Sequence, residues 1–259
     1  MPRDVRNLAP EAVENSALII AAMTQLILLP GLASNAVMWQ HQLTHLSAEL
    51  PVQVSTVHTL HDRIEAMASA VLEEYPGRLI LCGASMGGMV AMEVLRQAPQ
   101  RVRAAALLGT SARPEADDIR RLREAAIRLF QDGRSLEVLR ANVPLAFHAS
   151  RAQDRALTGT YLDFVLAAGV DQLVRQNRAV MARPDARQHL AHVNCPVLVL
   201  CGDSDQLTPP DCSHEIAALV PGAQLMMVGQ CGHMLTMEQP EFVTACLRDW
   251  LRVVNAAAV

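Results

Sequence analysis

The chain has 259 residues and a formal net charge of −4, with 51% hydrophobic and 19% charged residues, a composition typical of globular proteins. All 22 basic residues are arginine, which excludes lysine chemistry such as Schiff-base formation or the phosphate grip of a P-loop. The arginines are offset by 26 acids and form no basic run with aromatic residues between them. We therefore expect no nucleic-acid partner.

Six cysteines occur without any CxxC pair, and several lie inside apolar runs, where a reduced thiol behaves as a small hydrophobic group. This usage favours a reducing, cytoplasmic location, and a periplasmic protein with disulfides is the alternative. The apolar stretch 17–29 is interrupted by Thr24 and Gln25, is too short to span a bilayer, and lacks the charged start and cleavage site of a signal peptide. We therefore expect no membrane segment.

Short apolar runs alternate with helical patterns from residue 25 onward. Within residues 1–24, the stretch from Pro10 to Met23 fits either a short helix or an added strand. A strand is expected at 25–29, ended by Pro30 and Gly31, and apolar residues at helical spacing follow between 39 and 50. Further strands are expected at 51–57, 79–82 and 104–108, with helices at 64–72 and 86–96 between them.

The rhythm changes in the second half of the chain. Residues 112–190 show helical patterns in series without a strand, with breaks expected at Gly133, Pro144, Gly169 and Pro184. Strands resume at 197–201 and 224–228, with helices at 210–219 and 240–253. Strands that are apolar on both faces and alternate with helices predict a mostly parallel sheet covered by helices on both faces. We expect one α/β domain, with a core at about 25–111 and 191–259, a helical insertion at about 112–190 and an N-terminal extension at 1–24.

The pentapeptide Gly83-Ala84-Ser85-Met86-Gly87 has the form GxSxG and lies where an apolar strand ends and a helix begins. Such a turn is so tight that the serine takes a strained backbone conformation, and side chains two residues to either side would collide. The turn lifts the hydroxyl clear of the sheet. Ser85 is therefore the candidate nucleophile.

A nucleophilic serine needs a base that accepts its proton and an acid that orients the base. His233 follows the strand at 224–228, and Asp203 and Asp205 follow the strand at 197–201, so these groups lie at the carboxyl ends of parallel strands. We favour Asp205 over Asp203, because a residue three past Gly202 has cleared the strand end and can turn inward. His233 would be the general base and acid.

The negative charge that develops on a carbonyl oxygen needs backbone N–H donors. The amide of Met86 is one candidate, because it lies at the positive start of the helix that follows Ser85. The other candidate is the amide of Leu32, in the loop after the first strand, where Gly31 lets the backbone approach the substrate closely. Met234, beside His233, is a further candidate for substrate contact.

Together these segments resemble the α/β-hydrolase superfamily from about residue 25 to 251. The stretches LLPGLASNAVMW, LCGASMGGMVAMEVL, PVLVLCGDSDQLTPP and GQCGHMLTMEQPEFV are similar to its oxyanion loop, nucleophile elbow, acid loop and histidine loop. The resemblance implies an eight-stranded sheet, of which six strands are predicted above, with a helical lid inserted after the sixth family strand. Two departures stand out: Pro30 replaces the histidine of many relatives, and residues 1–24 stand in place of the N-terminal hairpin.

Single residues exclude some branches of the superfamily. Serine at position 85 argues against haloalkane dehalogenases and epoxide hydrolases, which need a carboxylate nucleophile, and the absence of lysine argues against plant-type hydroxynitrile lyases. Met234 departs from the tryptophan of many carbon-carbon bond hydrolases. Small-ester hydrolases, enol-lactonases and cofactor-free perhydrolases remain, and the histidine loop is most similar to carboxylesterases and 3-oxoadipate enol-lactonase-like hydrolases.

The sequence thus predicts a cofactor-free serine hydrolase that acts on a small carboxylic ester or lactone. Two alternatives stay open: a lyase or carbon-carbon bond hydrolase that uses the same residues for proton transfer, and a non-catalytic ligand receptor on the same scaffold. Histidine pairs such as His41 and His45 lack the glutamate of HExxH, so we expect no metal. Within the insertion, Arg113, Arg128 or Arg151 is a candidate for binding a substrate carboxylate.

Overall fold

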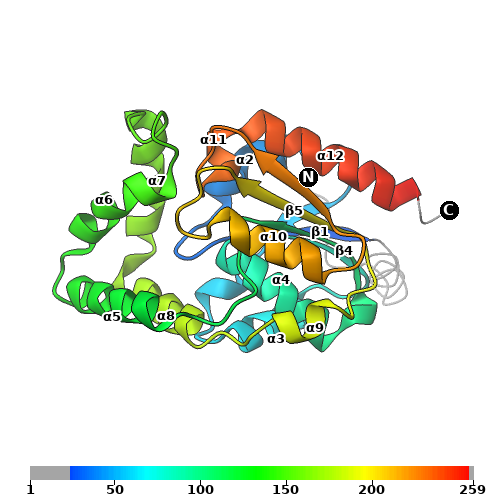
Figure 1. Ribbon diagram of the computed structural model, residues 1–259, viewed down its shortest axis with the longest axis horizontal. Helices are drawn as coiled ribbons and strands as arrows, with labels where there is room; N and C mark the ends of the chain where they lie inside the picture. The colour runs from blue at the N-terminus through cyan, green and yellow to red at the C-terminus, as the bar shows by residue number, and fades with distance from the viewer. Residues whose placement is uncertain (1–23, 257–259) are drawn as a thin grey trace, which may run out of the picture.

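A single sheet of six parallel strands runs through the part of the chain that the computed structural model describes, residues 24–256 (Figure 1). The strand order is β2-β1-β3-β4-β5-β6, and every neighbouring pair is parallel. The strands are β1 (Gln25–Leu29), β2 (Val52–Val54), β3 (Leu79–Ala84), β4 (Val102–Leu108), β5 (Val197–Gly202) and β6 (Gln224–Val228). The connections between parallel strands therefore have to cross over the faces of the sheet.

The central strands are apolar at successive positions because both faces of the sheet are covered. Leu26 and Leu28 belong to one buried cluster, whereas Ile27 and Leu29 belong to a second cluster on the opposite face. Each face of the sheet is covered by its own helices. The apolar runs in the sequence are continuous because the side chains on both faces of the central strands are buried.

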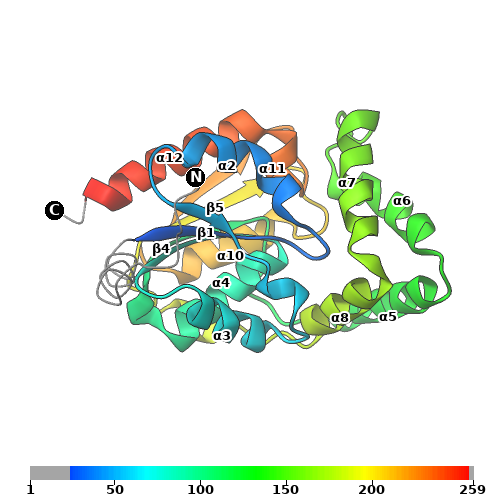
Figure 2. The same ribbon diagram turned by 180° about the vertical axis from the view of Figure 1, so that it is seen from behind.

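The two helical layers come from different parts of the chain (Figure 2). Helices α2 (Gln40–Leu46) and α12 (Pro240–Ala256) pack together on one face, and the short α11 (Leu235–Glu238) lies at their end. The other face carries α3 (Ile64–Glu74), α4 (Met86–Gln97), α9 (Arg187–Leu190) and α10 (Pro210–Leu219). Three 3-10 turns, η1 (Ala36–Trp39), η2 (Val57–Thr59) and η3 (Pro99–Arg101), join these elements.

The chain between β4 and β5 forms a separate group of helices beyond one end of the sheet (Figures 1 and 2). These helices are α5 (Asp117–Gln131), α6 (Ser135–Ala146), α7 (Arg155–Ala167) and α8 (Gly169–Met181). They pack in sequence, α5 against α6, α6 against α7 and α7 against α8, and α5 also packs against α8. The chain returns to the sheet through α9.

The predicted fold class is confirmed, and all six predicted strands are present. Three details differ. The strand expected at 51–57 is only Val52–Val54, because this edge strand has a partner on one side alone and the chain then turns into η2. Pro144 lies inside α6 and does not separate two helices: it stands in the last turn, so the helix ends two residues later at Ala146. Residues 187–190 of the expected insertion form α9, whose Leu190 is buried with the sheet.

The expectations for residues 1–23 lie outside the described residues. Within residues 24–256, no helix combines the length and the apolar character needed to cross a bilayer.

Candidate active site

The order of the strands places a topological switch point between β1 and β3. The chain moves outward from β1 to β2 and then returns to β3 on the other side of β1, so the loops after β1 and β3 leave in opposite directions. Ligands of open α/β sheets bind at such a switch point, outside the carboxyl ends of the strands. Gly31 follows β1 and Ser85 follows β3, and a Cβ placed on Gly31 would lie 3.4 Å from the Cβ of Ser85.

Ser85 sits on a strained turn between β3 and α4. Its φ is 54° and its ψ is −119°, a backbone conformation that costs about 1–3 kcal/mol for a residue with a side chain. The turn is held because the Ser85 N–H donates to the carbonyl of Leu108 (2.9 Å), while the Ser85 carbonyl accepts from the Thr110 hydroxyl (2.7 Å). The side chain of Ser85 is partly exposed at the turn.

The glycines of the pentapeptide are needed for space, as the sequence argument expects. A Cβ at position 83 would lie 2.3 Å from the Gly87 carbonyl oxygen, and a Cβ at position 87 would lie 2.0 Å from the Leu29 carbonyl oxygen. The first turn of α4 therefore packs directly against the end of β1. Gly88 adds a contact that the motif does not predict, because a Cβ there would meet the Thr110 side chain at 2.7 Å.

His233 and Asp205 lie side by side, at the ends of β6 and β5. The His233 Nδ1 is 2.8 Å from the Asp205 Oδ2, and both side chains are almost fully buried. Two backbone N–H groups, of Leu207 and Thr208, donate to Asp205 Oδ1 at 2.9 Å each, and the Thr208 hydroxyl donates to Oδ2 at 2.8 Å. Because Asp205 engages Nδ1, the remaining ring nitrogen, Nε2, is the one that can accept a proton from elsewhere.

Asp203, the competing acid, has a different task. Its carboxylate is exposed and accepts from the N–H groups of Gln230 (3.0 Å) and Cys231 (3.3 Å), at the start of the loop that carries His233. The structure thus places Asp205, and not Asp203, against the His233 ring.

Burial and the ion pair act in opposite directions on the pKa values of these two groups. Burial alone would raise the pKa of Asp205, but the charge and hydrogen bond of His233, with the Thr208 bonds, outweigh it and hold this pKa below its usual 3.8. Burial alone would lower the pKa of His233, but Asp205 outweighs it and raises this pKa above 6.5. The pair is therefore arranged to stabilise an imidazolium.

Residues 109 and 110 connect this pair to the turn at Ser85. A Cβ on Gly109 would lie 3.1 Å from Asp205 Oδ2 and 3.5 Å from His233 Nδ1, so the backbone of Gly109 touches the pair. The next residue, Thr110, hydrogen-bonds the Ser85 carbonyl. Ser85 and the His233–Asp205 pair therefore lie at the same edge of the sheet, where the parallel strands have their carboxyl ends.

The two candidate oxyanion donors belong to the segments that directly follow β3 and β1. Met86 is the first residue of α4, so its N–H has no acceptor inside the helix. Leu32 lies in a turn that is closed by a bond from the Ser34 N–H to the Gly31 carbonyl (3.2 Å). Ala33 in this turn has a φ of 52°, which is rare for a residue with a side chain.

Glu238 is a site residue that the sequence argument missed. Its side chain is buried in α11, and Oε1 accepts from the N–H groups of Gly232 (3.0 Å) and Met234 (3.2 Å), the two neighbours of His233. Oε2 accepts from the N–H of His148 (2.7 Å), in the loop after α6. Burial raises the pKa of Glu238 above its usual 4.5. The sequence signal that could have identified Glu238 is an acid five residues after His233.

Other sequence candidates take structural positions. Arg113 pairs with Asp211 (2.7 Å) and Glu215 (2.8 Å), and Arg151 lies 3.5 Å from Asp154, so neither is held ready for a substrate carboxylate. Met234 is buried beside His233, and its N–H also bonds the Ala146 carbonyl at 3.2 Å. Arg128 is exposed on α5.

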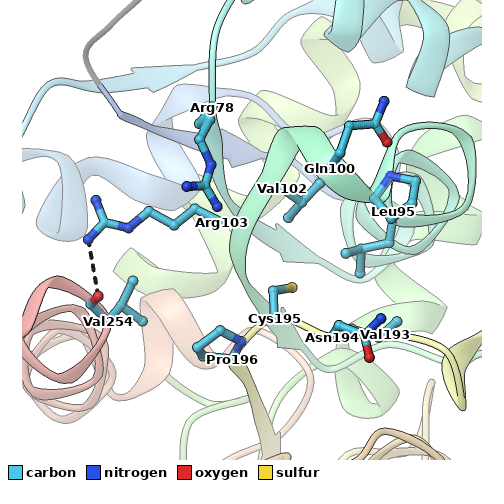
Figure 3. A pocket seen from close by; sticks show the side chains of 11 residues that line it. Arg78, Leu95, Gln100, Val102, Arg103, Val193, Asn194, Cys195, Pro196 and Val254 are labelled. Atoms are coloured by element: carbon cyan, nitrogen blue, oxygen red, sulfur yellow. Dashed lines mark hydrogen bonds between the residues drawn. The ribbon is translucent and has the colours of Figure 1, made fainter. Parts of the chain in front are cut away.

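A cavity of about 530 Å³ lies elsewhere in the molecule (Figure 3). It is lined by residues that precede or begin strands β3, β4 and β5, among them Arg78, Val102, Arg103 and Cys195. These are the amino ends of parallel strands, so the cavity is at the opposite edge of the sheet from Ser85 and His233. Within residues 24–256, no group of three or more His, Cys, Asp or Glu side chains is placed to hold a metal ion.

Comparison with known proteins decides the family. Residues 59–240 match the family model of the alpha/beta hydrolase fold. The chain belongs to the α/β-hydrolase family. Over 234 residues it is 25% identical to the pimeloyl-[acyl-carrier protein] methyl ester esterase of Nitrosomonas europaea, a match that covers 85% of this chain and 93% of the relative.

Two solved structures superpose closely on the chain. A thermophilic esterase from Thermogutta terrifontis, solved with malate bound, gives a TM-score of 0.80 at 26% identity, with 90% of this chain and 91% of the esterase covered. The enol-lactonase from Burkholderia xenovorans also gives 0.80, at 21% identity and with 89% and 92% covered, which shows a shared fold.

Proposed function

We propose that this α/β-hydrolase is a serine hydrolase that cleaves a small carboxylic ester or lactone through Ser85, His233 and Asp205. That it is a carboxylic ester hydrolase follows from its family and its esterase relatives. The roles of individual residues and the small size of the substrate are the proposed part. The setting we propose is the reducing cytoplasm, with no cofactor.

The first half of the proposed reaction forms an acyl-enzyme. Ser85 Oγ attacks the carbonyl carbon of the ester while His233 Nε2 takes the hydroxyl proton, and the imidazolium is stabilised by Asp205. The carbonyl oxygen becomes an oxyanion that accepts from the Leu32 and Met86 N–H groups. The carbon–oxygen bond of the ester then breaks, and the alkoxide leaves with the proton from His233.

The second half repeats these steps with water. His233 takes a proton from the water, the hydroxide attacks the acyl carbon, and a second oxyanion forms in the same place. Its collapse releases the carboxylic acid and returns the proton to Ser85 Oγ. A lactone would follow the same path, with the alcohol and the acid remaining in one product.

One observation carries this proposal. The strained Ser85, at the start of a helix, contacts Thr110, and the buried His233–Asp205 pair lies against the adjoining residue, Gly109. Strain of this kind persists where the surrounding structure requires it, and it is concentrated at functional sites. The buried pair has the geometry that activates a hydroxyl nucleophile.

The proposal is tested by labelling with a fluorophosphonate, followed by measurement of the intact protein mass. Wild type should gain one adduct per chain and hydrolyse p-nitrophenyl acetate, butyrate or octanoate, with the preferred chain length reporting the size of the acyl site. Ser85→Ala should lose the adduct and lower kcat by about 10⁴-fold or more. Ser150→Ala, at an exposed serine, is the matched control and should behave as wild type.

A wild-type protein that neither labels nor turns over any ester would contradict the acyl-transfer mechanism. Turnover without a trapped acyl-enzyme would instead favour proton transfer by the same residues. Binding without turnover would favour a receptor.

A further inference from the structure

A glutamine of the helical insertion reaches across to the loop that follows β1. The side chain of Gln176, in α8, is fully buried. Its Oε1 accepts from the Ala33 N–H at 2.6 Å, and its Nε2 donates to the His58 carbonyl at 2.7 Å. One side chain of the insertion therefore spans two loops of the core.

The orientation of this amide is determined by its partners. The backbone of Ala33 offers a donor and the His58 carbonyl offers an acceptor, so only one arrangement of the amide oxygen and nitrogen satisfies both. Both bonds are buried, where an unpaired N–H or carbonyl group costs about 1–3 kcal/mol.

A third bond closes the network. The His58 ring is buried, and its Nε2 lies 2.9 Å from the Ser34 carbonyl, to which a protonated Nε2 donates. Gln176 thus holds Ala33 directly, and it holds His58, which in turn holds Ser34. The loop is bound at two successive residues, and Leu32 immediately precedes them.

This segment of the loop needs support. Ala33 has a φ of 52°, a conformation that is unfavourable for alanine and that persists only if its surroundings enforce it. A loop relaxed out of this conformation would turn the neighbouring peptide groups and aim the Leu32 N–H elsewhere. An oxyanion donor is effective only when it is aimed in advance.

We propose that Gln176 is a positioning residue for the oxyanion loop, so that the helical insertion determines how well the Leu32 N–H stabilises the oxyanion. This inference rests on the proposed function. Gln176 touches neither substrate nor the reacting atoms, and it acts through Ala33.

Two variants remove this support in different ways. Gln176→Leu keeps most of the volume and removes both hydrogen bonds. Gln176→Asn keeps the amide but is one methylene too short to reach both partners. The matched control is Gln172→Leu, because Gln172 is a partly exposed residue on the same helix.

The rate of ester turnover is divided by the concentration of active sites, which is measured by titration with a fluorophosphonate, so that unfolded protein does not lower the apparent kcat. We expect both Gln176 variants to lower kcat about 10- to 100-fold, less than the loss of a whole donor, with KM changed less than about threefold. Binding of a trifluoromethyl ketone, whose adduct with Ser85 carries an oxyanion, should weaken by a similar factor. Gln172→Leu should match wild type.

Hydrogen exchange, read on a peptide that covers residues 30–40, tests the anchoring without any reliance on turnover. Exchange there should be faster in both Gln176 variants than in wild type and in Gln172→Leu. If wild type lacks esterase activity but the variants exchange faster, the proposed function fails and the anchoring of the loop stands.

The inference is overturned if a folded Gln176 variant keeps kcat and ketone affinity within about twofold of wild type, or if exchange in the loop is unchanged. It is also overturned if neither variant folds, because Gln176 would then support the fold as a whole. If only one of the two Gln176 variants folds, its kcat, its ketone affinity and its hydrogen exchange decide whether the inference stands.

Discussion

At the scale of single residues, two aspartates only two positions apart support different parts of the site. Asp205 is buried against the His233 ring, whereas Asp203 is exposed and accepts from the backbone at the start of the histidine loop. Asp205 acts on the charge of the His233 ring, and Asp203 acts on the position of the loop that carries it. Substitution of each should therefore give a different kinetic result.

Asp205→Asn should lower kcat by about 10³- to 10⁴-fold, because the imidazolium loses its counter-charge and its correct tautomer. Asp203→Asn, the matched control, leaves the His233–Asp205 bond in place and should cost about tenfold at most. Steady-state kinetics on the best nitrophenyl ester provides the measurement. Equal losses in the two variants would show that Asp205 is not the partner of the base.

The pH profile gives a second residue-scale prediction. The proposed mechanism needs neutral His233, so it predicts that kcat/KM falls as the pH decreases through the pKa of His233, which Asp205 raises above 6.5. In Asp205→Asn the burial that lowers the pKa of His233 remains, but the negative charge that raises this pKa is gone. The acid limb of the residual kcat/KM profile should therefore move to lower pH. An acid limb that stays in place would assign it to another group.

Glu238 accepts from three backbone N–H groups, two of them buried in the loop that carries His233 and the third, of His148, in the loop after α6. Glu238→Gln replaces one accepting oxygen by an NH₂ group, so at least one N–H loses its acceptor. We expect the free energy of unfolding to fall by about 1–3 kcal/mol in urea denaturation. Glu241→Gln, on an exposed acid at the start of α12, should change it by less than about 0.5 kcal/mol. An unaltered stability of Glu238→Gln would mean that water replaces the lost acceptor.

At the scale of elements, the site depends on how closely α4 approaches the end of β1. The position that permits this contact is Gly87, where a Cβ would lie 2.0 Å from the Leu29 carbonyl oxygen. Gly159, in α7, has no atom within 4 Å of its Cβ position. The same substitution at these two glycines should therefore have opposite effects.

Gly87→Ala should destabilise the protein by about 3 kcal/mol or more, because α4 has to move away from β1 and the turn at Ser85 moves with it. Gly159→Ala should stabilise α7 by about 0.5–1 kcal/mol, since alanine is the better helix former and has room. Urea denaturation of both variants checks the pair. Similar losses at both positions would contradict the close contact.

At the scale of the whole molecule, the six cysteines are all free thiols, and burial raises the pKa of every one. Cys82 and Cys231 lie next to the elbow and the histidine loop in sequence but are completely buried. Cys195 is half-buried, and its pKa is raised to about 11. The thiolate is the reactive form, so these thiols should be inert in the folded state.

N-ethylmaleimide at pH 7 should therefore leave ester hydrolysis unchanged over the time in which it modifies a small thiol completely. Ellman's reagent should react quickly with all six thiols only after unfolding in guanidinium. Reductant should not alter the melting temperature. Rapid inactivation by the maleimide would show that Cys82 or Cys231 becomes accessible when the site opens.

The strands, the flanking helices and the place of the insertion could be predicted because each depends on local pattern. The run 79–82 is apolar throughout because this strand is covered on both faces of the sheet. The glycines at 83 and 87 indicate a turn that has no room for side chains at these positions. The residues at which helices and strands begin and end are harder to predict from the sequence. Proline breaks helices in general, yet Pro144 lies within the last turn of α6, which continues to Ala146.

The sequence by itself predicted the family and placed Ser85, His233 and the two candidate acids after strand ends, because the apolar run before each of them defines that strand. Only the tertiary structure decided that Asp205, and not Asp203, lies against the His233 ring. Only the tertiary structure decided that Glu238 braces the histidine loop against the loop after α6 and that Gln176 braces the loop at Ala33. Ala33 and Gln176 are 143 positions apart, and their bond exists only once α8 and β1 have been brought together. Buried hydrogen bonds between distant segments leave no periodic pattern in the sequence, because they depend on the packing of whole elements.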